Sequence, residues 1–289
     1  MSKKKPNTTQ STKIPAIITG TSKLISYISP KLTTLFASKL FTTPIKHKTP
    51  KREFEMIANS IQKKILIPEI KKEVVVYEYG ISDKKVLLVH GWSGRGTQLV
   101  KIADEFIKAG FSIISFDAPG HGKSPGNNSI MVDFIATIHE IDKLYGPFEA
   151  AIGHSLGGMS VINAIKEGLK VKNATIIGSG DVVQDIIDDF ISKLKLPAKY
   201  AVLLREFFEK KYGGKMSDYS VFKAAQSLTI PVLVIHDNQD YEVPVSAGLN
   251  IYKHLANGEL MLTENLGHRK ILGDTQVIEK VVNFTRTHL

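Results

Sequence analysis

Hydrophobic residues recur along most of the chain with two periods, one typical of strands and one typical of helices. From residue 72 onward, short apolar runs alternate with stretches in which apolar residues recur every three or four positions. This alternation predicts a parallel sheet with helices on both faces. The predicted strands are Val74–Tyr79, Lys85–Val89, Ser112–Phe116, Ala150–Gly153, Ala174–Ile177, Val232–His236 and Glu259–Leu262. The predicted helices are Gln98–Lys108, Ile130–Tyr145, Leu156–Glu167, Ser246–Leu255 and Thr275–His288.

One segment interrupts the alternation. Residues 181–229 have helical periodicity only, in 182–194 and 199–211, and they lie between two predicted strands. We therefore expect a helical cap inserted into the sheet domain at about 181–229. Its large apolar residues have two interpretations, the lining of a substrate pocket or the core of the cap itself; they are Phe190, Leu194, Leu203, Phe207 and Phe208.

The first 52 residues form a leader with a different pattern, ahead of a main domain over 53–289. Residues 1–13 are polar and are expected to be a disordered tail, whereas 17–28 and 32–41 predict two short amphipathic helices separated by Pro30. Residues 42–52 are interpreted as a linker. Three interpretations of the helices remain open: an anchor on a membrane surface, an arm packed on the body, or a targeting peptide.

Composition limits the class of protein. A chain of 289 residues is long enough for one α/β domain with a sizeable core, and 43% of its residues are hydrophobic. The longest apolar runs are well short of the roughly 20 residues that span a bilayer, which excludes an integral membrane protein. The absence of cysteine excludes disulfides, thiolate metal sites and a cysteine nucleophile. The expected location is the cytoplasm, and membrane association through the leader stays open as one of the three interpretations above.

The net charge of +10 is unevenly distributed. Of the 38 Lys and Arg residues, 11 lie in 1–52, where there is no Asp or Glu. The remaining 27 basic residues accompany all 28 acidic ones, so residues 53–289 are close to neutral. We therefore expect no nucleic-acid partner for the main domain.

The stretch Gly153-His154-Ser155-Leu156-Gly157-Gly158 carries the strongest chemical signal. It follows a predicted strand and begins a predicted helix, so Ser155 lies at a strand-to-helix turn. Glycines at 153 and 157 permit a sharp bend and close packing, which presents a serine hydroxyl to a cleft. A five-residue pattern of this kind also arises by chance, so its context has to decide.

Four further segments supply that context. A glycine-rich turn at 90–95 follows a strand and can direct the N–H of Trp92 at an oxyanion, opposite the N–H of Leu156. The turn at 117–124 is interpreted as scaffold. A strand ending in 237–240 offers two carboxylates, and a loop at 265–270 carries His268. A serine nucleophile needs an imidazole base, and the imidazole needs a carboxylate to fix its tautomer.

In these motifs and in their order, serine, then aspartate, then histidine, the sequence resembles the serine hydrolases of the α/β-hydrolase superfamily over residues 73–289. The resemblance implies an α/β-hydrolase fold, with Ser155 as nucleophile, His268 as base, and the N–H groups of Trp92 and Leu156 as oxyanion hole. The family acid falls on Asp240. Asp237 occupies the place of a family glycine and remains the alternative acid.

The other histidines and the remaining functions complete the expectations. His154, His236 and His90 are interpreted as packing or turn residues, and His121 as part of a scaffold turn. No metal or cofactor site is expected.

The predicted activity is hydrolysis of carboxylic esters or thioesters, with small esters as substrates. Alternatives are an acyltransferase or thioesterase of the same fold, and a non-catalytic ligand-binding module at a membrane surface. The sequence does not fix the substrate or the oligomeric state.

Overall fold

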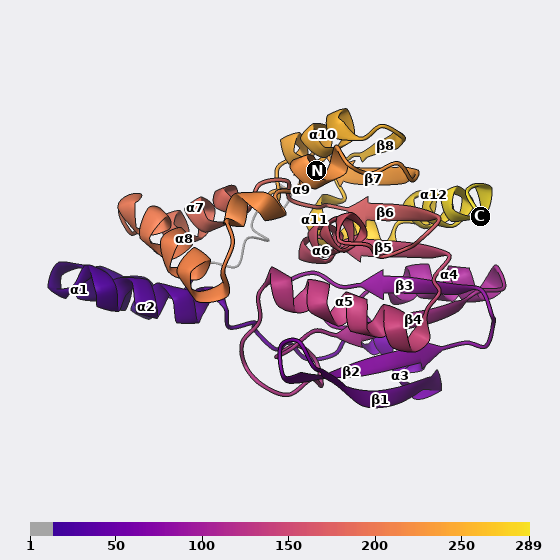
Figure 1. Cartoon of the computed structure of the whole chain (residues 1–289), viewed down its shortest axis with the longest axis horizontal. Helices are drawn as coiled ribbons and strands as arrows, with labels where there is room; N and C mark the ends of the chain where they lie inside the picture. The colour runs from indigo at the N-terminus through magenta and orange to yellow at the C-terminus, as the bar shows by residue number, and fades with distance from the viewer. Residues whose placement is uncertain (1–13) are drawn as a thin grey trace, which may run out of the picture.

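A computed structural model describes residues 14–289, so the expected tail at 1–13 lies outside the described residues. Within this range the strands form one eight-stranded sheet in the order β1-β2-β4-β3-β5-β6-β7-β8 (Figure 1). Strand β2 pairs antiparallel with β1 and with β4, and the other neighbours pair parallel. The strands are β1 (Ser60–Ile67), β2 (Lys72–Tyr79), β3 (Lys85–Val89), β4 (Ser112–Asp117), β5 (Ala150–His154), β6 (Asn173–Ile177), β7 (Val232–Asp237) and β8 (Gly258–Thr263).

Helices cover both faces of the sheet and bury it in two separate cores. One core joins the sheet to α5, α6, α9 and α10, and the other joins it to α4 and α12. Every residue of β4, β5, β6 and β7 is buried, which explains why these strands read as apolar runs instead of alternating patterns. The body helices are α3 (Phe54–Asn59), α4 (Val100–Lys108), α5 (Met131–Tyr145), α6 (Leu156–Lys166), α9 (Val221–Ala225), α10 (Val245–His254), α11 (Gly267–Lys270) and α12 (Thr275–Thr287).

The fold class predicted from the sequence is confirmed, and the seven predicted strands and five predicted body helices are present with bounds that shift by one or two residues. Strand β1 and helix α3 were not predicted. Strand β1 lies at the edge of the sheet, and its exposed polar residues Gln62, Lys63 and Lys64 separate Ile61 from the short apolar run at 65–67. Its polar residues keep an exposed edge soluble.

The segment predicted as a linker is fastened to the body rather than free. The N–H of Ile45 donates to Ser93 Oγ over 2.9 Å, and Lys46 Nζ donates to the carbonyl of Ser124 over 3.0 Å. A 3-10 turn, η1 (Lys51–Glu53), ends the segment. The leader is therefore tied to the turns that follow β3 and β4.

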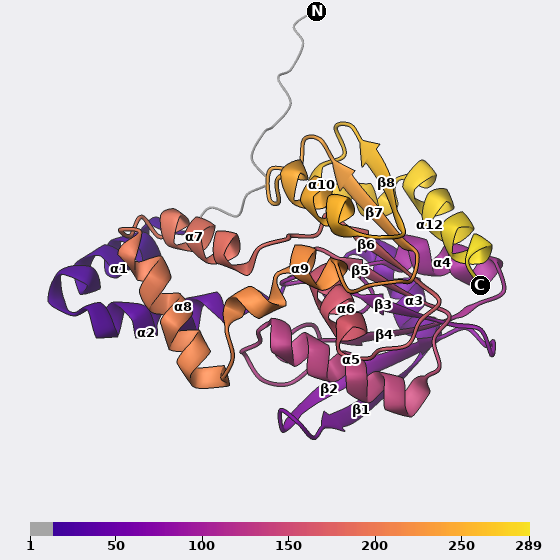
Figure 2. The same ribbon diagram turned by 45° about the horizontal axis from the view of Figure 1, so that its top comes forward.

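The cap consists of helices from two distant parts of the sequence. Between β6 and β7 lie α7 (Val183–Lys193), α8 (Lys199–Tyr212) and the 3-10 turn η2 (Met216–Tyr219), ahead of α9. Helices α1 (Ala16–Ile28) and α2 (Pro30–Phe41) of the leader pack on them, and all four extend away from the sheet (Figures 1 and 2). Within the described residues, no helix is long and apolar enough to cross a membrane.

The large apolar residues of the cap lie in its own core. Phe41 of α2 contacts Phe190 and Phe208, with ring centroids 5.1 and 5.5 Å apart. Leu194 and Leu204 are fully buried in the same cluster. All five residues, Phe190, Leu194, Leu203, Phe207 and Phe208, pack in the core of the cap, and Phe208 also lines a cavity of about 50 Å³ between α5, α8 and η2.

Candidate active site

Ser155 lies at a strained turn between β5 and α6. Its backbone has φ 53° and ψ −122°, a conformation that non-glycine residues rarely adopt, and its N–H donates to the carbonyl of Ile177 over 2.9 Å. The turn requires glycine at 157, because a Cβ there would overlap the main-chain oxygens of Val89 and His90. The half-buried Ser155 is thus held at the end of β5, beside the end of β3.

His268 and Asp240 form a buried pair. His268 lies in the short helix α11, and its Nδ1–H donates to Asp240 Oδ2 over 2.7 Å. The other carboxylate oxygen accepts the N–H groups of Glu242 and Val243 over 2.8 and 2.9 Å. Burial alone would raise the pKa of Asp240, but the hydrogen bond and charge of His268 and the two N–H groups hold that pKa below its ordinary value. Asp240 is therefore ionised and can fix the tautomer of His268.

Contacts with β5 and β6 place this pair beside the serine turn. His154 Nε2–H donates to the main-chain oxygen of His268 over 2.9 Å, and the two rings are 4.7 Å apart. Gly178 follows β6 with φ 57°, and a Cβ there would lie 3.2 Å from His268 Nδ1. Glycine thus leaves room for the imidazole at the edge of the sheet where Ser155 lies.

His154 and Gly178 were not predicted to contact His268. His154 directly precedes Ser155, but the sequence does not show the fold that brings the loop at 265–270 back to it. For Gly178 there was a signal, a Gly-Ser-Gly turn after a strand, although it indicated only a strand end.

Asp237 is fully occupied elsewhere. Its Oδ1 accepts the N–H of Gln239 over 3.0 Å, and its Oδ2 accepts the hydroxyl of Thr263 and the N–H of Leu266 over 2.7 and 3.0 Å. Burial opposes its charge, but these bonds lower the pKa of Asp237 below its ordinary value. Asp237 ties the loop after β7 to the loop that carries His268, whereas Asp240 is the carboxylate in contact with the imidazole.

Two main-chain amides lie at the serine turn. A Cβ on Gly91 would lie 3.0 Å from Ser155 Cβ, so the turn that carries Trp92 rests against the serine. Leu156 is the first residue of α6, where helix N–H groups lack partners inside the helix. Within residues 14–289 we find no hydrogen bond from the N–H of Trp92 or of Leu156. Both N–H groups therefore have no hydrogen-bond partner among the described residues.

Four buried histidines surround the site without a partner carboxylate at hydrogen-bond distance. Burial lowers the pKa of His154 to about 3 and that of His121 to about 4, and it also lowers the pKa of His90 and His236. His90 accepts the N–H of Ala118 on Nε2 over 3.0 Å, and its Nδ1 lies 2.7 Å from the carbonyl of Gly91, so it stabilises its turn. These rings are neutral in the folded protein at pH 7.

The buried histidines predict a steep loss of stability in mild acid. Their pKa values are lowered by folding, so the unfolded chain binds more protons below about pH 6.5, and folding stability falls as the pH falls. Each group that stays neutral in the fold contributes about 1.4 kcal/mol per pH unit. This loss extends down to about pH 4 for His121 and to about pH 3 for His154. Urea unfolding at pH 7.5, 6.0 and 5.0 measures it, and a constant free energy of unfolding would contradict it.

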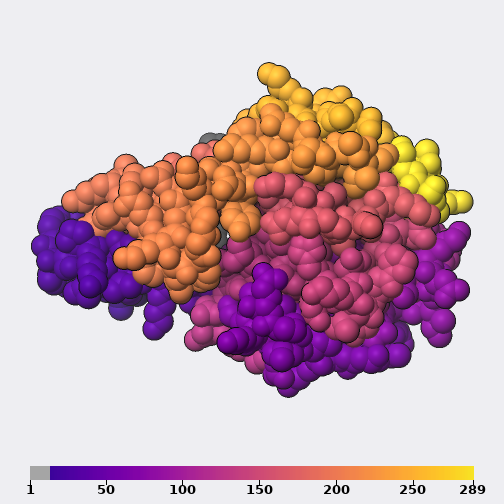
Figure 3. Space-filling view, in the orientation of Figure 1, coloured from indigo at the N-terminus to yellow at the C-terminus, as the bar shows by residue number. Residues whose placement is uncertain are grey.

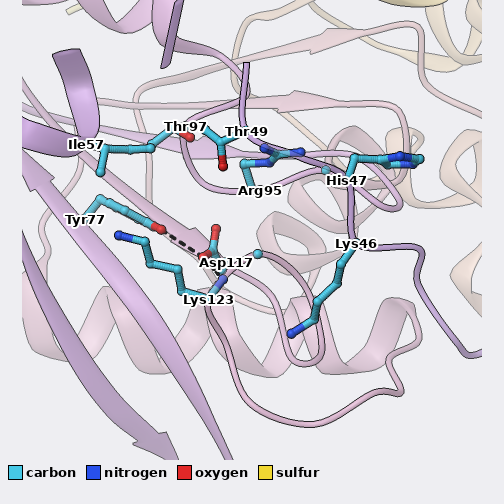
Figure 4. A pocket seen from close by; sticks show the side chains of 11 residues that line it. Lys46, His47, Thr49, Ile57, Tyr77, Arg95, Thr97, Asp117 and Lys123 are labelled. Carbon is cyan, nitrogen blue, oxygen red and sulfur yellow. Dashed lines mark hydrogen bonds between the residues drawn. The ribbon is translucent and has the colours of Figure 1, made fainter. Parts of the chain in front are cut away.

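A separate cavity of about 100 Å³ lies beside the turn after β3 (Figure 4). Asp117 holds this region together, because its carboxylate accepts the N–H groups of Gly96 and Lys123 and the hydroxyl of Tyr77. Burial raises the pKa of Asp117. The predicted scaffold turn thus joins β4 to the turn that carries Trp92. None of the predicted site residues lines this cavity. No cluster suited to a metal ion is found within residues 14–289.

Comparison with known proteins gives consistent matches. A model of the Alpha/beta hydrolase family matches residues 86–264. A curated relative, the uncharacterized 31.7 kDa protein in the traX-finO intergenic region of Escherichia coli, is 26% identical over 239 residues, which covers 65% of this chain and 84% of the relative.

Solved structures share the fold at low identity. An esterase from Pyrococcus furiosus has a TM-score of 0.64 and 18% identity, and the match covers 86% of this chain and 97% of the esterase. An esterase from Exiguobacterium antarcticum has a TM-score of 0.62 and 16% identity, and the match covers 78% of this chain and 100% of the esterase. A proline iminopeptidase from Mycobacterium smegmatis has a TM-score of 0.60 and 16% identity, covering 79% and 98%.

Proposed function

Because the chain belongs to the alpha/beta hydrolase family, we propose that it is a serine hydrolase that cleaves carboxylic esters through an acyl-enzyme on Ser155. The observation that carries the proposal is the 2.7 Å hydrogen bond between the buried side chains of Asp240 and His268. The main-chain oxygen of His268 also accepts a hydrogen bond from His154, the residue directly before the strained Ser155. A serine, an imidazole and a carboxylate at one sheet edge have the roles that acyl transfer requires.

In the proposed first step, Ser155 Oγ attacks the carbonyl carbon of the ester while His268 Nε2 takes the hydroxyl proton. Asp240 accepts the Nδ1–H, so it stabilises the imidazolium ion that forms. The tetrahedral intermediate collapses, the bond to the alcohol oxygen breaks, and His268 returns the proton to that oxygen. The acyl group remains on Ser155 as an ester.

In the second step, water replaces the alcohol. His268 takes a proton from water as the water oxygen attacks the acyl carbon, and the proton then returns to Ser155 when the carboxylic acid leaves. The negative oxygen formed in both steps is proposed to accept the N–H groups of Trp92 and Leu156. Their lack of a partner within residues 14–289 and the contact of the Trp92 turn with Ser155 support this role. A missing oxyanion donor typically lowers kcat about 10²–10³-fold.

The next experiment identifies the leaving group of the substrate, which is an alcohol in an ester and a thiol in a thioester. Esterases are among the proteins of similar structure, which favours oxygen esters. The test is the turnover of p-nitrophenyl acetate, butyrate and octanoate, repeated with acyl thioesters and with added alcohol acceptors. We expect steady release of p-nitrophenolate and free carboxylic acid. Preferred transfer to the added alcohol would replace the hydrolase by an acyltransferase, and no turnover of any ester would leave a non-catalytic module.

A further inference from the structure

The helical hairpin formed by α1 and α2 has an inverted distribution of side chains. In α1, the residues buried in the protein are Thr19 and Ser22. The large apolar side chains on the same helix are exposed: Ile17 by 79%, Leu24 by 64% and Ile28 by 71%. An ordinary amphipathic helix buries the apolar residues and exposes the polar ones.

The buried hydroxyl groups do not need water, because they bond within their own helices. Thr19 Oγ1 donates to the carbonyl of Ala16 over 3.0 Å, and Ser22 Oγ donates to that of Ile18 over 2.8 Å. In α2, Thr33 and Thr34 bond in the same way to residues four positions earlier. Small residues with satisfied hydroxyls allow α1, α2 and α8 to pack closely. Ile18, Leu40 and Phe41 also pack in the cap core, and most of the other large apolar residues of the hairpin are exposed.

The exposed apolar residues are spaced as one face of α1. Ile17, Leu24 and Ile28 are separated by seven and four residues, which places them on a common stripe at 3.6 residues per turn. Tyr27 lies next to this stripe and is also exposed. On α2, Leu32 and Leu35 are exposed beside Lys31 and Lys39. Exposed apolar residues that are grouped in this way indicate a contact surface.

Charge distinguishes among the surfaces that could cover the hairpin. Residues 14–41 carry Lys23, Lys31 and Lys39, all exposed, and no acidic residue occurs anywhere in 1–52. Apolar side chains flanked by lysines suit a bilayer with anionic lipids, because the acyl chains take the apolar groups and the headgroups attract the ammonium groups. A second copy of the hairpin would bring like charges together.

The position of the hairpin fits a flat partner. Helices α1 and α2 lie at the far end of the cap, and they extend beyond the sheet and its helices (Figures 1 and 2). In the space-filling view, the indigo atoms of α1 form the far end of the cap, next to the salmon and orange atoms of α7 and α8 (Figure 3). A planar surface can therefore reach them without meeting the body. Helix α7 is acidic on balance, with Asp185, Asp188 and Asp189 against Lys193, so it adds no attraction to an anionic surface.

From these observations we infer that the α1–α2 hairpin docks the protein on anionic lipid surfaces. Ile17, Leu24 and Ile28 enter the boundary between headgroups and acyl chains, and Lys23, Lys31 and Lys39 contact the anionic headgroups. The contact lies in the interface plane and does not cross the bilayer. It does not depend on the proposed function, because no residue of the hairpin is placed in the reaction.

The test is sedimentation of the full chain with large vesicles of phosphatidylcholine, with and without 30% phosphatidylglycerol. We expect binding to the anionic vesicles at 0.1 M salt, at least tenfold stronger than to neutral ones, and weaker at 1 M salt, where the Debye length falls from about 10 Å to 3 Å. Ser155→Ala should bind like the wild type. Equal recovery of the wild type in the supernatant with both vesicles would overturn the inference.

Variants separate the apolar face from the charges. Ile17→Gln, Leu24→Gln and Ile28→Gln combined should weaken vesicle binding at least tenfold, whereas Lys23→Gln, Lys31→Gln and Lys39→Gln should remove the preference for anionic vesicles. The matched control replaces three exposed apolar residues of the body, Ile81→Gln, Leu144→Gln and Leu249→Gln, and should bind like the wild type. Far-UV circular dichroism and melting temperature check the fold of each variant.

Two results with the variants would also overturn the inference. One is binding by the apolar hairpin variant that equals that of the wild type. The other is a wild type that sediments as a dimer and binds no vesicles, with the apolar hairpin variant as a monomer, because the hairpin would then contact a second copy of the chain.

Discussion

Replacing Ser155 by alanine is expected to lower kcat for p-nitrophenyl butyrate about 10⁵-fold, because no group remains to form the acyl-enzyme. The residual rate over that in water would come from the oxyanion amides and from binding. Ser155 is half-buried, and alanine lacks only the hydroxyl, so the melting temperature should change little. The substitution therefore separates chemistry from folding.

The matched control for this variant is Ser160→Ala. Ser160 lies on the same helix, α6, and its buried hydroxyl donates to the carbonyl of Leu156 over 2.8 Å. Ser160→Ala removes a hydroxyl group from the same helix and leaves the proposed nucleophile in place, so its kcat should stay within a few-fold of the wild-type value. Initial rates at saturating substrate measure both variants. If Ser155→Ala keeps a tenth or more of the wild-type kcat, Ser155 is not the nucleophile.

Replacing Asp240 by asparagine is expected to lower kcat about 10⁴-fold. The asparagine NH₂ can donate to His268 Nδ1, which moves the imidazole proton to Nε2, the nitrogen that has to accept the proton of Ser155. The same replacement at Asp237 should reduce kcat less than tenfold, because its carboxylate bonds to Gln239, Thr263 and Leu266 instead of the imidazole.

The two variants should also differ in stability. Asp237→Asn places an NH₂ group where the N–H of Leu266 or the hydroxyl of Thr263 now donates, which should cost about 1–3 kcal/mol of unfolding free energy. Measurements of kcat and of urea unfolding should therefore separate the two variants: Asp240→Asn loses mainly kcat, and Asp237→Asn loses mainly unfolding free energy. A larger loss of kcat in Asp237→Asn than in Asp240→Asn would move the role of the acid to Asp237.

The sequence predicts the sheet well where its strands are buried on both faces. In β4 to β7, apolar runs bounded by glycine and polar residues mark the strands directly. The turn at Ser155 is also predicted from the local sequence, because the turn requires glycine at fixed positions around the serine. Strand β1 was not predicted because the exposed polar residues 62–64 interrupt its apolar positions, which an edge strand tolerates.

Contacts between distant segments account for most of what the sequence does not predict. Asp237 and Asp240 are three residues apart and equally polar. The family resemblance assigns the acid to Asp240, but no local pattern shows that Asp240 contacts His268 while Asp237 binds the N–H of Leu266. The contact of His154 with the carbonyl of His268 joins residues 114 positions apart. No local pattern contains that information.

The leader is a second case in which the sequence predicts the helices but not their contacts. Its periodicity predicts two helices correctly, but not which face of each is buried. Because Thr19 and Ser22 of α1 satisfy their hydroxyls within the helix, a polar face can be buried and the apolar face exposed. The apolar residues of the cap likewise could line a pocket or form a core, and the sequence does not show that Phe41 of α2 packs against Phe190 and Phe208 in that core.

The central claim is that Ser155 is the activated nucleophile, and covalent labelling with a fluorophosphonate tests it most directly. The native protein is labelled and digested with trypsin, and the modified residue is located by tandem mass spectrometry in the peptide 144–166, which contains Ser155 and Ser160. We expect the phosphonate on Ser155, no labelling of Ser155→Ala, and much slower labelling of Asp240→Asn. Absence of labelling of the wild type, or a phosphonate on another residue, would contradict the claim.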